Sequence, residues 1–299
     1  MTLVTERASI GIVGLGLVGQ ALARRLLAAG FAPVGFDLRP EARAAFEALG
    51  GAAVDSVAVV GARTGCVLLA VFDSDDVTDV VEGGDGLLSG TSRVGSLIDC
   101  STGDPEKLRA LAQRLAARNI DFIEGPLSGS SQQIAAGQAT QLLGGTDAAI
   151  AACKDVLDAI ATRRVHVGAA GMAAKAKLAT NLVLGLNRVA LAEGMVFAES
   201  LGIAPEKFLA LVLDTPARSA AAEAKGQMMV SGEFAPQSRI RQHLKDVRLM
   251  LESAAASGQQ LPLSEIHARL MSDAVEAGDG DLDNAAIIRQ LRRERRRPS

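Results

Sequence analysis

Residues 10–19 read IGIVGLGLVG, a short apolar run that leads into three glycines and then into an alanine- and leucine-rich stretch. This order predicts a strand, a tight turn and a helix. In such a turn the first glycine permits the bend, the second lets a pyrophosphate approach the backbone, and the third allows close helix–strand packing. The helix N-terminus would add unpaired N–H groups and a partial positive charge. The sequence therefore predicts dinucleotide binding at Gly14, Gly16, Leu17, Val18 and Gly19.

A carboxylate follows the second predicted strand, about 20 residues after the glycines, as a dinucleotide site requires. Asp37 could accept hydrogen bonds from the ribose hydroxyls of NAD and would repel the 2′-phosphate of NADP. Arg39 stands two residues later and could pair with such a phosphate if Asp37 turned aside. We favour a solvated loop position for Arg39 and NAD as the cofactor, and NADP stays open.

The first half of the chain alternates β-type runs with helical stretches. Alternation of this kind predicts a parallel sheet with helices on both faces. The expected strands are 10–13, 33–37, 65–71, 96–100 and 121–124, with two more at 141–143 and 164–167. The clearest helices between them are 20–29, 41–49 and 105–119.

Strand signals nearly vanish after Gly171. Residues 172–201 predict one long, largely apolar helix, buried on several sides between domains or subunits, which ends at Gly202. Shorter helices are expected at 205–213, 219–230, 240–257, 263–277 and 284–292. We therefore predict a Rossmann-type, doubly wound α/β domain over residues 1–167 and an all-helical domain over 168–299. The helix at 168–202 would join them.

Composition and charge exclude several classes of protein. The 31 Lys and Arg residues against 34 Asp and Glu give a net charge of −3, which argues against nucleic-acid or anionic-membrane binding. Three scattered cysteines suit neither a disulfide framework nor a zinc site, and the three histidines suggest no metal. The N-terminus lacks the order of a signal peptide, and no stretch has 18 uncharged apolar residues. We expect a soluble cytoplasmic protein whose basic stretch at 289–297 finishes a helix.

Two further patterns bear on chemistry. Lys177 and Asn181 are spaced i, i+4 and share one face of the long helix. Lys177 is either a side chain that snorkels to solvent, as Lys175 is expected to be, or a partly buried amine with a lowered pKa that suits proton transfer. The loop GPLSGSS at 125–131 offers N–H groups and hydroxyls to a carboxylate. An ordinary turn with serine N-caps explains the loop equally well.

In their order along the chain, these motifs resemble the β-hydroxyacid dehydrogenase family, which includes 3-hydroxyisobutyrate dehydrogenase and tartronate semialdehyde reductase. The similarity covers about residues 10–291. It rests on GLGLVG at 14–19, GPLSGS at 125–130, GAAGMAAKAKLATN at 168–181, LKDVRL at 244–249 and LPL at 261–263. Motifs in the same order are far more specific than any single motif.

The resemblance implies an NAD(P)-dependent oxidoreductase that interconverts a small 3-hydroxy acid and its semialdehyde or keto acid. Lys177 would be the catalytic acid/base, and Asn181 would orient the substrate. Lys245 would close over the nicotinamide and the substrate. The substrate carboxylate would be held by Ser128, Gly129 and Ser130, and the cofactor would be covered by Val71 and Phe72 and flanked by Ser101 and Thr102.

The chain departs from the family pattern where the substrate would bind. Ser130 stands in place of a second glycine, and Val71-Phe72 replaces the usual Leu-Pro. Arg218 lies in a region that usually lines the substrate pocket, so it could meet a second anionic group or be a surface arginine before a helix.

Two other interpretations stay open from the sequence. An imine reductase would share this architecture but usually lacks the lysine, and a non-catalytic regulator could sense NADH. We also expect a homodimer or homotetramer, because the apolar helical domain presents faces that need covering.

Overall fold

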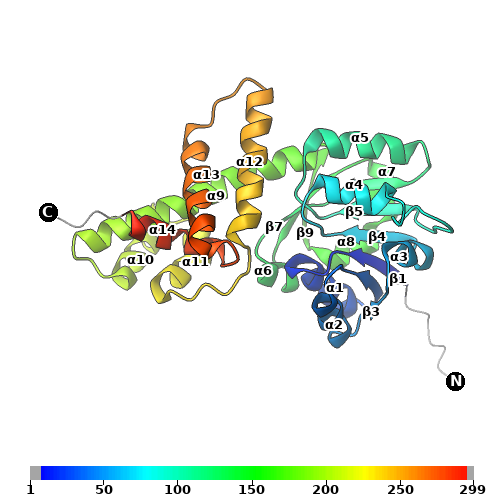
Figure 1. Ribbon diagram of the computed structural model, residues 1–299, viewed down its shortest axis with the longest axis horizontal. Helices are drawn as coiled ribbons and strands as arrows, with labels where there is room; N and C mark the ends of the chain where they lie inside the picture. The colour runs from blue at the N-terminus through cyan, green and yellow to red at the C-terminus, as the bar shows by residue number, and fades with distance from the viewer. Residues whose placement is uncertain (1–7, 295–299) are drawn as a thin grey trace. The chain divides into compact units, whose positions relative to one another are not determined.

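The computed structural model describes residues 8–294 of the 299-residue chain (Figure 1). Residues 1–7, on which the prediction of no signal peptide rests, lie outside this range. The last part of the basic stretch, residues 295–297, does so as well. The chain forms two compact units that divide between Lys177 and Leu178. The boundary predicted at residue 168 falls at the end of the last strand.

The first unit is built on one sheet with the order β3-β2-β1-β4-β5-β6-β8-β7, in which β9 also pairs with β8. The five strands predicted with most support are present and mutually parallel. They are β1 (Ser9–Val13), β2 (Ala32–Phe36), β4 (Cys66–Leu69), β5 (Ser96–Asp99) and β6 (Asp121–Glu124). Their carboxyl ends therefore meet at one edge of the sheet, where ligands bind in folds of this type.

The predicted doubly wound parallel sheet is confirmed, and one side of it departs from the parallel pattern. β8 (Thr140–Gly144) runs antiparallel to β6 and to β7 (Leu127–Ser128), while β9 (Arg163–Gly168) is parallel to β8. The connection from β7 to β8 contains only the five-residue helix α6 (Ser131–Ala135). A parallel crossover usually needs a dozen or more residues, so the chain turns back here. The opposite edge carries the short β3 (Ala52–Ala53).

Helices cover both faces of the sheet, as predicted (Figure 1). Side chains such as Ile12 and Leu68 pack on one face, and Val13 and Leu69 pack on the other. Because both faces are buried, the central strands are almost entirely apolar. The helices are α1 (Leu17–Ala28), α2 (Pro40–Ala48), α3 (Val57–Arg63), α4 (Ser74–Glu82), α5 (Pro105–Ala116), α7 (Asp147–Ala152) and α8 (Lys154–Ile160), besides α6.

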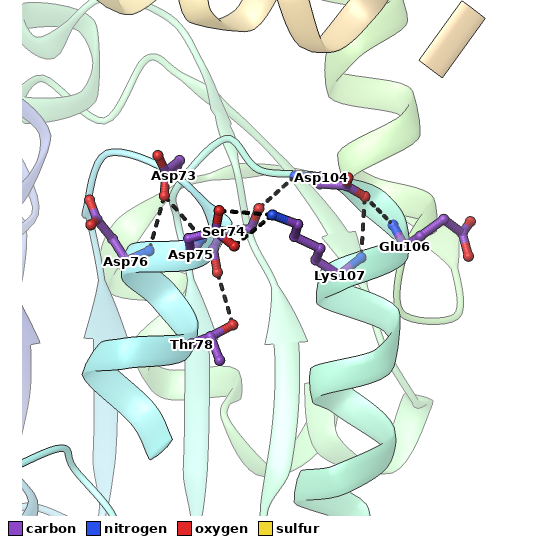
Figure 2. Close-up of polar contacts among 8 residues, drawn as sticks. All are labelled: Asp73, Ser74, Asp75, Asp76, Thr78, Asp104, Glu106 and Lys107. Carbon is purple, nitrogen blue, oxygen red and sulfur yellow. Dashed lines mark hydrogen bonds and ion pairs between the residues drawn. The ribbon is translucent and has the colours of Figure 1, made fainter. Parts of the chain in front are cut away.

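The loops after β4 and β5 are joined to each other at the edge that carries the strands' carboxyl ends (Figure 2). Asp73 caps α4 and Asp104 caps α5, and each carboxylate accepts hydrogen bonds from two amides of its helix. The Asp104 amide donates to the Ser74 hydroxyl at 3.2 Å, and Lys107 Nζ pairs with Asp75 at 2.6 Å. The acidic residues after β4 thus start a helix.

The second unit contains helices and no strand within residues 178–294. α9 (Met172–Ser200) begins in the first unit and continues into the second. The others are α10 (Pro205–Leu213), α11 (Ala220–Ser231), α12 (Ile240–Ala256), α13 (Pro262–Ala274) and α14 (Ile287–Arg293). The helix predicted to reach residue 277 is α13, which changes at Val275 into a π-helical turn that contains Gly278 at φ +86°.

Within one chain, α9 is buried along a single stripe. Leu178, Leu191 and Met195 pack in the core of the second unit, whereas Val183 and Phe197 (63% exposed) face outward. Burial on several sides, as expected from the sequence, is therefore not achieved inside one chain. By length and composition alone α9 could cross a membrane. One such helix is weak evidence for a membrane span, because the core helix of a soluble protein passes the same test.

Candidate active site

The glycines after β1 have the geometry that the sequence predicts. Gly14 has φ +88°, and a Cβ at Gly19 would collide with the Gly14 carbonyl oxygen. Gly16 begins α1 and has no side-chain cap, which leaves first-turn amides of Leu17 and Val18 available to an anion. A Cβ at Gly16 would meet only the tip of Arg39, at 3.5 Å. These residues fit the pyrophosphate of a dinucleotide.

The Asp37 carboxylate lies beside this turn and accepts hydrogen bonds from two main-chain amides and one guanidinium. Its Oδ2 accepts a hydrogen bond from the Leu15 amide at 2.8 Å, and its Oδ1 accepts one from the Arg39 amide at 2.9 Å. The Arg39 guanidinium, half-exposed, donates to both carboxylate oxygens at 3.1 Å. Burial acts to raise the pKa of Asp37, but the bonds from Arg39 and Leu15 leave it below its ordinary value. Arg39 is therefore neither simply solvated nor free for a phosphate.

The predicted cofactor-covering residues follow β4 and β5 at the same edge. The Val71 amide donates to the Ser101 hydroxyl at 3.1 Å, so the two loops are linked directly. The Phe72 amide donates to Asp76 at 3.3 Å, and the Phe72 ring is partly exposed. Thr102 follows Ser101 and is half-buried. The four predicted residues therefore lie just after the ends of two neighbouring strands, β4 and β5.

The loop after β6 was predicted to be either a carboxylate-binding loop or an ordinary turn with serine N-caps, and the structure shows one such N-cap. Ser130 is the N-cap of α6 and forms a capping box with Gln133, whose side chain accepts from the Ser130 amide at 2.8 Å. The hydroxyl oxygen of Ser130 accepts a hydrogen bond from the Gln133 amide at 3.3 Å and caps the helix. Ser128 lies on β7 and is half-buried, and Gly129 separates the two serines.

Lys177 and Lys175 differ as the sequence suggested they would. Lys177 is 7% exposed, and its Nζ donates to the Leu127 carbonyl at 2.6 Å. This bond places the amine beside the loop that contains Ser128. Lys175 is 51% exposed and pairs with Glu106 at 2.9 Å. Lys177 is therefore buried against the loop after β6, whereas Lys175 reaches solvent.

Sequence reasoning missed Glu124, the last residue of β6. Its side chain is fully buried, and Oε2 accepts hydrogen bonds from the amides of Gly171 at 2.8 Å and Ala173 at 3.1 Å. Burial raises the pKa of Glu124 to about 7, the amide bonds oppose that rise, and the nearby carboxylate of Asp99 adds to it. The only signal in the sequence was its place directly before the quoted loop.

In the second unit, Asp246 connects two of the predicted residues. Asn181 Nδ2 donates to Asp246 Oδ2 at 3.4 Å, and Lys245 Nζ pairs with Asp246 Oδ1 at 3.1 Å. Asp246 is buried, and its neighbour Lys245 is nearly so. The motif at 244–249 contains Asp246, but no sequence pattern predicted a contact for it.

Arg218 lies before α11 and pairs with Glu223 at 2.6 Å, and both side chains are exposed. This is the surface position considered as the simpler alternative. Its contact with a second anionic group stays a prediction. Among residues 8–294, no cluster of three or more His, Cys, Asp or Glu side chains could hold a metal ion.

Comparison with known proteins gives two family matches. Residues 9–168 match the NAD binding domain of 6-phosphogluconate dehydrogenase, and residues 171–291 match the NAD-binding domain of NADP-dependent 3-hydroxyisobutyrate dehydrogenase. The L-threonate dehydrogenase of Cupriavidus necator is 31% identical over 282 residues, which cover 94% of this chain and 95% of that protein. The 2-(hydroxymethyl)glutarate dehydrogenase of Eubacterium barkeri is 30% identical over 94% of this chain and 93% of its own.

A solved structure of 3-hydroxyisobutyrate dehydrogenase from Salmonella typhimurium is similar, with a TM-score of 0.84 and 29% identity. The match covers 94% of this chain and 99% of that one. These relatives are hydroxyacid dehydrogenases, so the imine reductase interpretation is not favoured. The matches to these relatives extend over nearly the whole chain. This protein accordingly belongs to the β-hydroxyacid dehydrogenase family of NAD(P)-dependent oxidoreductases.

Proposed function

We propose that this protein interconverts a small 3-hydroxy acid and its semialdehyde or keto acid, with Lys177 as the acid/base. The observation that carries this proposal is the buried amine of Lys177, held 2.6 Å from the Leu127 carbonyl beside the Ser128 loop. A structural lysine near a helix end would extend to solvent, as Lys175 does.

The chemistry assigned to the chain is proton transfer and orientation. In oxidation, the Lys177 amine accepts the proton of the substrate hydroxyl. In reduction, it donates a proton to the oxygen that gains negative charge. A bound nicotinamide supplies the hydride acceptor or donor. Asn181, one turn further along the same face of α9, is proposed to orient the substrate.

The substrate carboxylate is assigned to the loop after β6. Ser128 and Gly129 offer a hydroxyl and main-chain N–H groups, while the Ser130 side chain holds α6 in place. Lys245 is proposed to approach the nicotinamide and the substrate. Arg218 is proposed to meet a second anionic group after release from Glu223.

A panel of small acids tests the reaction. NADH absorbance at 340 nm would be followed with 3-hydroxyisobutyrate, L-threonate, 2-(hydroxymethyl)glutarate and 2-hydroxy-3-oxopropionate, and with L-lactate as a control without a 3-hydroxyl. We expect turnover with at least one 3-hydroxy acid or semialdehyde and none with L-lactate. The chain has no Trp or Tyr, so NADH binding can be measured in parallel by its fluorescence. NADH binding without turnover of any compound would favour a regulator.

NAD is the proposed cofactor, because Asp37 is buried beside the glycine turn and carries a charge that opposes a 2′-phosphate. Asp37→Asn keeps an acceptor for the Leu15 amide but removes that charge and releases Arg39. We expect the ratio of kcat/KM with NAD to kcat/KM with NADP to fall about 10- to 100-fold, the range for a hydrogen bond to a charged group. Steady-state kinetics with both cofactors measures it.

The matched control for cofactor choice is the double variant Asp37→Asn/Arg39→Ala. If the freed Arg39 recognises the 2′-phosphate, the double variant loses the gain with NADP that the single variant shows. An unchanged cofactor ratio in Asp37→Asn would contradict the assignment of Asp37.

We propose a cytoplasmic homodimer or homotetramer. The outward face of α9 carries Val183, Phe197 and then Leu201, and α13 exposes Leu263 and Ile266. Exposed apolar side chains of this size are typical of a surface that another subunit covers.

A further inference from the structure

Glu124 makes its contacts far from its own position in sequence. Its Oε2 accepts hydrogen bonds from the Gly171 and Ala173 amides, 47 and 49 residues further along the chain. These amides lie at the start of α9, where the first N–H groups have no partner within the helix. A carboxylate at this end also interacts favourably with the helix dipole. Glu124 therefore serves α9 as an N-cap supplied by another element.

The same short segment contacts α9 a second time. Three residues after Glu124, the Leu127 carbonyl accepts the hydrogen bond from Lys177 Nζ at 2.6 Å. Residues 124–127, from the end of β6 to the start of β7, thus contact both the first turn of the helix and the amine that the helix carries. Because Lys177 follows Ala173 by one helical turn, a shift of that first turn would move the amine relative to Leu127.

The neighbouring strand β8 packs closely against Glu124 and the start of α9. Gly144 on β8 is paired with Glu124 across the sheet. A Cβ at Gly144 would collide with Glu124 Oε2 and would lie 3.1 Å from the Ala173 amide nitrogen and Cβ. The carboxylate and the helix start therefore pack directly over a glycine, which restricts movement of either.

We propose that Glu124 is a positioning residue that fixes the first turn of α9 and so holds the Lys177 amine at the Leu127 carbonyl. This proposal rests on the proposed role of Lys177. Glu124 does not touch the reacting atoms. Its contribution is the placement of the helix that carries the acid/base, and an error of about 1 Å in such a placement can cost about 100-fold in rate.

The first test is independent of the reaction. Amide hydrogen exchange of the peptide that covers residues 169–177 would be measured in the protein without cofactor. We expect Glu124→Ala to exchange about tenfold faster there, because a cap is lost. Glu124→Gln retains an oxygen acceptor of the same reach and should stay within about threefold of the parent. Glu106→Ala, which removes the exposed partner of Lys175, is the matched control and should leave this exchange unchanged.

The second test connects the contact to turnover. With the best substrate from the acid panel, we expect Glu124→Ala to lower kcat about 10- to 100-fold with the KM for NAD unchanged within about twofold. Glu124→Gln should restore most of the loss. In a Lys177→Ala background, Glu124→Ala should cost almost nothing further, because the group it positions is absent.

Two outcomes would overturn the proposal. One is unchanged exchange of the 169–177 peptide in Glu124→Ala, which would show that the carboxylate does not hold the helix. The other is an equal loss of kcat with and without Lys177, which would show a general effect on the fold. Full turnover in Lys177→Ala alone would refute the proposed function instead, and the exchange result would still report on the helix. Glu124→Gln is isosteric, so it provides a folded variant if the alanine variant unfolds.

Discussion

Lys177→Ala is expected to lower kcat by about 10²- to 10⁴-fold, the usual contribution of a positioned acid/base. The amine is buried and held at the Leu127 carbonyl, so removing it deletes the proton carrier without disturbing the glycine turn or Asp37. NADH should therefore bind with nearly the parent Kd. Steady-state assays of NADH absorbance at 340 nm measure the loss of kcat, and NADH fluorescence titration measures the Kd.

Lys175→Ala is the matched control for this experiment. It removes the same side chain two residues earlier, where the amine is exposed and pairs with Glu106. An exposed pair contributes roughly 0–1 kcal/mol to stability, so turnover should stay within about twofold of the parent. Equal losses in the two variants, or none in Lys177→Ala, would remove Lys177 from the proposed mechanism.

Asp283→Ala is expected to destabilise the helical unit by about 3–5 kcal/mol, because it leaves a buried charge unpaired. Asp283 is fully buried, and its Oδ2 accepts from Lys225 Nζ at 2.9 Å and from the Gln237 amide at 2.9 Å. Its Oδ1 accepts from the Ala285 amide at 3.0 Å. Burial lowers the pKa of Lys225, and Asp283 opposes that shift. Burial also lowers the pKa of Arg188 to about 10, and the Asp283 carboxylate opposes that shift.

Urea unfolding followed by far-UV circular dichroism would measure this loss, since the chain has no Trp or Tyr for intrinsic fluorescence. The control is Asp283→Asn/Lys225→Met, which removes the carboxylate and its ammonium partner together and keeps one oxygen acceptor for the amides. It should be more stable than Asp283→Ala. Equal stability of the two variants would mean that the unpaired charge is not the source of the loss.

Much of the fold could be predicted because it depends on local pattern. Five parallel strands and the long helix follow from apolar periodicity, glycine placement and the loss of strand signals after Gly171. The reversal at β8 could not, because it depends on how the short connection after β7 closes in space. The sequence predicted an apolar long helix, but composition does not show which of its faces is covered within one chain.

The candidate site divides in the same way. Lys177, Asn181 and the glycine turn were found because spacing within one element decides which side chains share a face. Glu124 and Asp246 were not, because their hydrogen bonds join residues 47 and 65 positions apart. Arg39 was expected to be solvated and instead pairs with Asp37, through a contact that depends on the path of the loop.

By itself, the sequence determined the order of elements, the dinucleotide turn and the shared helix face of Lys177 and Asn181, because these depend on residue type and short-range spacing. Tertiary structure alone decided which carboxylate caps α9 and which carbonyl accepts the hydrogen bond from Lys177. Hydrogen bonds between distant segments form only after the sheet has brought them together, and their partners cannot be read from periodicity.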